Sequence, residues 1–63
     1  MTRLEALRTS KSWSRAELAR RAGLHPSTVG LIESGRLRPY SGQLEKLARA
    51  LDVLPNDLHG GTQ

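Results

Sequence analysis

The stretch GLHPSTVGLIESG, Gly23 to Gly35, decides the fold, because it places a helical run of about two turns between two glycines. The run before it, SRAELARRA, is also helical and stops at Gly23, a residue type suited to the left-handed position after a helix end. Pro26 then fits the first position of a new helix, which needs no backbone amide hydrogen, with His25 as its N-cap. The sequence therefore predicts two short helices joined by a tight turn.

The pattern of apolar residues indicates how these two helices pack. Ser14 and Glu17 have the spacing of a capping box, so the earlier helix is expected from about Arg15 to Ala22. Its inner stripe is Leu18, Ala19 and Ala22, and the inner residues of the next helix are Val29 and Ile32. Two helices crossing at a short glycine turn form a helix-turn-helix. Such a crossing presents the second helix outward, where it can enter the major groove of DNA.

Three further helices are expected around this pair. Thr2 and Glu5 have capping-box spacing, Ser41 is expected to cap a fourth helix, and Pro55 opens a last turn that reaches Leu58. The fourth helix has the i, i+3, i+4, i+7 pattern of a buried face, formed by Leu44, Leu47, Ala48 and Leu51. The prediction is an all-α fold of five short helices in one helix-turn-helix domain over residues 1–59, followed by a flexible C-terminal tail over residues 60–63.

Composition excludes several classes of function. With 63 residues and no cysteine, the chain is one small domain without disulfides or thiolate metal sites. His25 and His59 stand far apart without ligand spacing, so no metal and no cofactor are expected. No nucleophile–base pair or phosphate loop suggests an enzyme. No apolar run approaches the roughly 18 residues of a membrane span, and the chain is expected to be cytoplasmic.

The positive charge is concentrated in one region. The formal net charge is +4, and the segment from Lys11 to Arg38 holds six cations against two anions, which accounts for all of it. This distribution suits a polyanionic partner such as DNA. The alternative is a basic surface that serves only solubility.

Most of the sequence resembles a known family. The segment WSRAELARRAGLHPSTVGLIESGRLRPYSGQLEKLARALDVLPNDL is similar to the lambda-repressor-like, Cro/xenobiotic-response-element (XRE) family of DNA-binding domains, over about Leu4 to Leu58. The most specific parts are S-x-x-E-L-A-x-x-A-G, S-T-V-x-x-I-E-x-G and P-x-x-x-x-L-x-x-L-A-x-A-L. The resemblance implies a transcriptional regulator that binds double-stranded DNA.

The resemblance also implies roles for individual residues. Arg15 falls where the family usually has a glutamine that contacts the DNA backbone and supports the reading helix. His25, Pro26, Ser27 and Leu31 fall at positions that usually face bases, whereas Ser34, Arg36 and Arg38 fall in the loop that follows the backbone. Arg8 and Glu33 match a pair that commonly forms a buried salt bridge between the first and third helices.

The reading helix departs from the family at its base-facing positions. Pro26, Ser27 and Leu31 cannot make the bidentate contacts that Gln, Asn, Arg or Lys make with base edges. We therefore hypothesise that much of the specificity comes from Arg15, His25 and DNA shape. Gly30 costs the helix about 1 kcal/mol relative to alanine, and the sequence leaves open whether it allows close approach to DNA or is simply tolerated.

The leading interpretation is a repressor that binds an inverted repeat as a homodimer, with half-sites about 34 Å apart. Its dimer surface is expected on the last two helices and the tail, with Leu51, Val53, Leu54 and Leu58 as candidates. Two alternatives involve a protein partner: the antitoxin of a toxin–antitoxin pair, and an interaction module on a helix-turn-helix scaffold.

Overall fold

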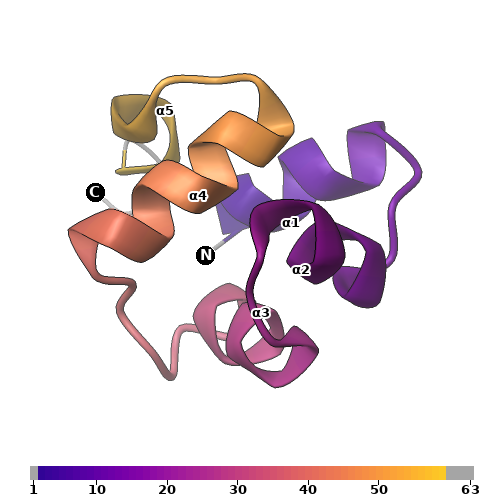
Figure 1. Cartoon of the computed structure of the whole chain (residues 1–63), viewed down its shortest axis with the longest axis horizontal. Coiled ribbons are helices and arrows are strands. Elements are labelled where there is room, and N and C mark those ends of the chain that lie inside the picture. The colour runs from indigo at the N-terminus through magenta and orange to yellow at the C-terminus, as the bar shows by residue number, and fades with distance from the viewer. Residues whose placement is uncertain (1, 60–63) are drawn as a thin grey trace.

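The computed structural model describes residues 2–59, and the side chains of residues 3–58. Five α-helices follow one another: α1 (Thr2–Ser10), α2 (Arg15–Ala22), α3 (Pro26–Glu33), α4 (Ser41–Leu51) and α5 (Pro55–His59). Within this range there are no strands, and the predicted all-α fold of five short helices is confirmed (Figure 1). The Thr2 side chain, which is expected to form a cap, and the expected tail over residues 60–63 lie outside what the structure describes.

All five helices contribute to one apolar core. The buried core side chains include Leu4 of α1, Leu58 of α5 and every residue of the predicted inner stripes, namely Leu18, Ala19, Ala22, Val29, Ile32, Leu44, Leu47, Ala48 and Leu51. Trp13, between α1 and α2, is half-buried and packs against this core. The small side chains of Ala19 and Ala22 let α2 lie close to its neighbours, and α2 packs against both α3 and α4.

The turn between α2 and α3 forms as predicted. Gly23 has φ +73°, the left-handed conformation, and Leu24 N–H donates to the Ala19 carbonyl over 2.8 Å. Pro26 is the first residue of α3, and His25 is its N-cap, with Nδ1 accepting a hydrogen bond from Ser27 N–H at 3.3 Å. These bonds fix the crossing of α2 and α3, because they hold the short turn between the two helices in one conformation.

One predicted cap is wrong, and another forms only in part. The N-cap of α4 is Tyr40, because the Gln43 side chain accepts a hydrogen bond from Tyr40 N–H at 3.0 Å, so Ser41 is already helical. Ser14 caps α2 by accepting from Glu17 N–H at 3.0 Å. The Glu17 carboxylate does not complete the box, since it binds the guanidinium groups of Arg20 and Arg21 instead. Both kinds of bond to a carboxylate are charge-assisted, and here the two arginines take it.

Candidate nucleic-acid interface

Helix α3 has one buried face and one exposed face. Val29 and Ile32 are fully buried, whereas the opposite face is open to solvent. Each of the residues expected to contact DNA has an exposed side chain: Arg15, His25, Pro26, Ser27, Leu31, Ser34, Arg36 and Arg38. They come from the start of α2, from α3 and its N-cap, and from the loop after α3, which runs beside α3 at the bottom of Figure 1. The fold thus brings two further segments of chain beside one exposed helix.

The exposed face of α3 has few polar groups. Leu31 is 42% exposed and can only make apolar contacts, and Ser27 contributes one hydroxyl. The imidazole of His25 uses Nδ1 to cap the helix, so Nε2 is the ring nitrogen left to bind a ligand. The hydroxyl of Ser34 donates to the Leu31 carbonyl at 3.0 Å. This face can therefore make only a small number of directional contacts.

A buried ion pair ties α1 to α3 behind this face. Arg8 Nε lies 2.6 Å from Glu33 Oε2, and Arg8 Nη2 donates to Oε1 at 3.2 Å, so the two side chains meet edge to edge. Arg8 Nη1 also donates to the Trp13 carbonyl at 2.7 Å. Both charged residues are 8% exposed. Bidentate arginine–carboxylate pairs fix orientation as well as distance, so this pair sets the position of the last turn of α3.

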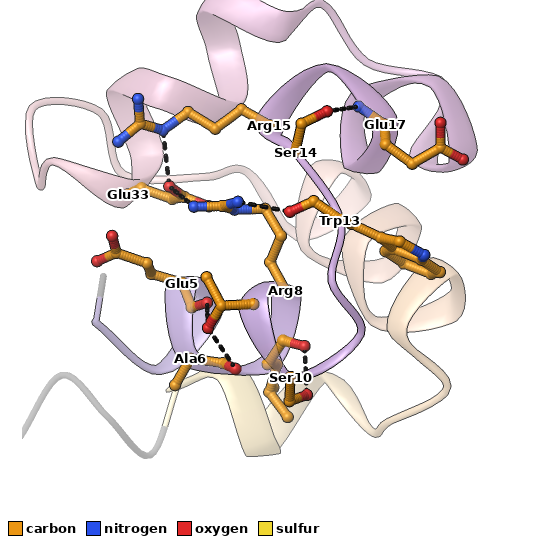
Figure 2. Close-up of polar contacts among 11 residues, drawn as sticks. Glu5, Ala6, Arg8, Ser10, Trp13, Ser14, Arg15, Glu17 and Glu33 are labelled. Carbon is orange, nitrogen blue, oxygen red and sulfur yellow. Dashed lines mark hydrogen bonds and ion pairs between the residues drawn. The ribbon is translucent and has the colours of Figure 1, made fainter.

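Arg15 joins the same carboxylate from α2, which sequence reasoning did not anticipate. Its Nε donates to Glu33 Oε1 at 2.9 Å, and its side chain remains 58% exposed (Figure 2). Its Cδ lies 3.9 Å from where a Cβ on Gly30 would stand, so the stem of Arg15 passes along α3. Although arginine replaces the family's usual glutamine, it braces the outward-facing helix.

The electrostatic surroundings keep Glu33 ionised. Burial raises the pKa of this carboxyl, but hydrogen bonds from Arg8 and Arg15 outweigh it and hold the pKa below its ordinary value. Glu33 is thus a charged anchor between two cations. Nothing in the described residues groups three or more side chains of the kind that bind a metal ion.

The loop between α3 and α4 is anchored at its start. The N–H groups of Arg36 and Leu37 both donate to the Leu31 carbonyl, at 3.0 and 3.2 Å, and Gly35 has φ +83°. Leu37 is half-buried against the core, and the cations on either side of it, Arg36 and Arg38, are exposed. Packing of Leu37 therefore presents two arginines beside α3.

Two other cations belong to a different side of the molecule. Arg20 and Arg21 pair with Glu17, and the guanidinium of Arg21 lies 4.4 Å from the centre of the Trp13 ring. Figure 2 shows the side chains of Arg15 and Glu17 leaving α2 in opposite directions. The positive charge of the segment from Lys11 to Arg38 is therefore divided between two surfaces.

Comparison with known proteins agrees with this geometry. The chain is 42% identical over 50 residues to an uncharacterized HTH-type transcriptional regulator, y4dL, of Sinorhizobium fredii (strain NBRC 101917 / NGR234). That match covers 79% of this chain but 26% of the relative, so the chain spans about a quarter of that protein's length.

No helix among the described residues combines the length and apolar character of a membrane span.

A solved structure is also similar. The crystal structure of the restriction-modification controller protein C.AhdI from Aeromonas hydrophila superimposes with a TM-score of 0.86 at 43% identity, over 89% of this chain and 85% of that chain. A family model described as a helix-turn-helix domain matches residues 2–59. The matched region begins with α1 and ends with α5, so it includes the whole described fold. The chain belongs to the helix-turn-helix domain family.

Proposed function

We propose that the chain is a sequence-specific regulator of transcription that inserts α3 into the major groove of double-stranded DNA. The observation that carries this proposal is the exposed face of α3, flanked by Arg15 on one segment and by Arg36 and Arg38 on another. A helix held outward in this way contacts base edges with its N-terminal residues, while flanking cations bind phosphates. The two similar proteins, an HTH-type transcriptional regulator and a restriction-modification controller protein, support the assignment.

In this proposal the exposed residues have separate tasks. Arg15, Arg36 and Arg38 bind phosphate oxygens, and Ser34 lies at the start of the same backbone-following loop. His25, Pro26, Ser27 and Leu31 face the bases. Since the base-facing set has few donors and acceptors, DNA shape contributes much of the specificity. Binding to chromosomal DNA places the protein in the cytoplasm.

The size of the domain favours a homodimer on an inverted repeat. Its principal extents are 26 × 21 × 19 Å, which is less than the roughly 34 Å between successive major-groove faces of the duplex. One copy thus presents its α3 to one groove, and a second copy doubles the number of bases contacted. Such a dimer represses transcription when the operator to which it binds overlaps a promoter.

The proposed dimer surface lies on α4 and α5. Of its four leucine and valine candidates, Leu51 and Leu58 are buried in the core and do not contribute. Leu54 is 69% exposed, and Val53 lines a shallow depression between α4 and α5 together with Glu45, Ala48, Arg49 and Pro55. An exposed apolar patch around Leu54 and Leu58 would favour the antitoxin alternative, and because Leu58 is buried, only Leu54 of this pair is exposed.

Selection of binding sites from a random duplex pool tests the proposal. We expect an enriched inverted repeat, bound much more tightly than a scrambled copy at two salt concentrations. Replacing Arg38 with Gln should lower the salt slope by about one for each lost phosphate contact. The matched variant Lys46→Gln removes an exposed cation of α4, outside the proposed DNA interface, and should leave the salt slope nearly unchanged. Enrichment of a single half-site would contradict the proposed homodimer. No enrichment at all would favour an interaction module instead.

A further inference from the structure

Tyr40 is an exposed aromatic residue at the end of the loop between α3 and α4. Its side chain is 73% exposed, and it takes no part in the hydrophobic core. Its backbone is held on both sides, because its N–H donates to the Gln43 side chain at 3.0 Å and its carbonyl accepts from Leu44 N–H at 2.8 Å. The fold therefore fixes where this ring stands without using the ring for packing.

Exposure alternates along the loop that leads to Tyr40. Arg36, Arg38 and Tyr40 are exposed, whereas Leu37 and Pro39 are partly buried. Tyr40 has an extended backbone, with φ −69° and ψ 161°, and Pro39 restricts the residue before it to extended conformations as well. A single residue separates Arg38 from Tyr40, so these two exposed side chains leave neighbouring points of the loop. Tyr40 thus continues the outward series that the two arginines begin.

The chemistry of this series suits the DNA backbone. From Ser34 to Leu44 the chain has two cations and no anion, so a phosphate approaching the arginines meets no repulsion from the loop itself. A tyrosine hydroxyl is a neutral donor that can bond to a phosphate oxygen, and tyrosine is among the side chains that bind the backbone in protein–DNA complexes. We propose that Tyr40 is a further DNA-contacting residue, whose hydroxyl donates a hydrogen bond to a phosphate oxygen next to those bound by Arg36 and Arg38.

This inference rests on the proposed function and makes a distinct prediction for salt dependence. A hydroxyl carries no charge and releases no counterion, unlike an arginine. Replacing Tyr40 with Phe should weaken binding about tenfold per chain, equally on the selected duplex and on its scrambled copy. The salt slope should stay that of the wild-type chain, in contrast to Arg38→Gln. Ser10→Ala, which removes an exposed hydroxyl from α1, is the matched control and should bind normally.

A spectroscopic readout reports the contact directly. Tyr40 is the chain's single tyrosine, so 3-fluorotyrosine places one fluorine label at this position. Its ¹⁹F resonance should shift as the duplex is added. Unchanged affinity of Tyr40→Phe would overturn the hydroxyl contact, even if Tyr40→Ala binds weakly, because the ring alone would then act. If the wild-type chain binds no duplex, the proposed function fails together with the inference; if it binds and Tyr40→Phe is silent, only the inference fails.

Discussion

Replacement of Gly30 by alanine tests whether the fold of α3 needs this glycine. Gly30 lies inside α3, and a Cβ built on it would meet one atom within 4 Å, Arg15 Cδ at 3.9 Å. That distance is an ordinary van der Waals contact, so the methyl group fits without displacement. Its backbone also lacks the positive φ that is found at Gly23 and Gly35. Neither space nor conformation therefore requires a glycine at this position.

The expected gain follows from helix propensity. Alanine in a helix interior is more favourable than glycine by about 1 kcal/mol, mainly because the unfolded chain loses less backbone freedom. For a domain of this size, 1 kcal/mol corresponds to roughly 4–8 °C in the midpoint of thermal unfolding. Gly30→Ala should raise the midpoint by about this amount. The new methyl group meets Arg15 Cδ at an ordinary contact distance, so the Arg15 side chain need not move. We therefore expect DNA affinity to remain that of the wild-type chain.

Gly23→Ala is the matched control. A Cβ on Gly23 meets nothing within 4 Å, but φ there is +73°, which costs an L-residue about 1–2 kcal/mol. Both variants add a methyl group that fits without a clash, and they should shift the midpoint in opposite directions. Circular dichroism at 222 nm during heating measures both. A lower midpoint for Gly30→Ala, or shifts of the same sign, would refute the reasoning.

Further predictions concern a buried charge and a helix end. Glu33→Gln leaves the guanidinium of Arg8 buried without its anion and should cost about 3 kcal/mol in urea unfolding. Since the pKa of Glu33 is held below its ordinary 4.5, this stabilisation is present above about pH 4.5 and is lost as the pH falls through the lower pKa of the folded chain. The difference between wild type and variant should therefore shrink in acid. Asp52 ends α4 with φ +61°, so Asp52→Gly should raise the unfolding midpoint by removing strain and a negative charge from the helix C-terminus, a gain of about 0.5–1 kcal/mol.

Features set by neighbouring residues could be predicted from the sequence. The buried stripe of α4, from Leu44 to Leu51, follows from the helical period alone, since one face of a helix must cover the core. The turn at Gly23 and the start of α3 at Pro26 are equally local, because each depends on the backbone preference of one residue. The fold class and the helix-turn-helix follow from these signals together.

Features that depend on competition between partners were harder to predict. Glu17 had the spacing to complete a capping box, but its carboxylate accepts hydrogen bonds from two arginines one turn away instead. Ser41 is a residue type that often caps helices, but the Gln43 side chain reaches back to Tyr40 N–H and moves the cap one residue earlier. In each case the residue type was compatible with the prediction, and the side-chain geometry selected another partner.

The bond between Arg15 and Glu33 could not be predicted from spacing, because the crossing of α2 and α3 brings together residues 18 apart in the sequence. It has a consequence for DNA binding. A long arginine side chain loses rotamer freedom when it binds a phosphate, and part of that loss has already occurred where Nε is held by a buried carboxylate. The dashed line in Figure 2 starts at Nε, so this bond does not use the two terminal amino groups, and the side chain is 58% exposed. Glu33 thus holds α3 in place and also orients Arg15, a proposed phosphate-binding residue. Loss of the Glu33 charge should therefore weaken DNA binding by more than its effect on folding explains.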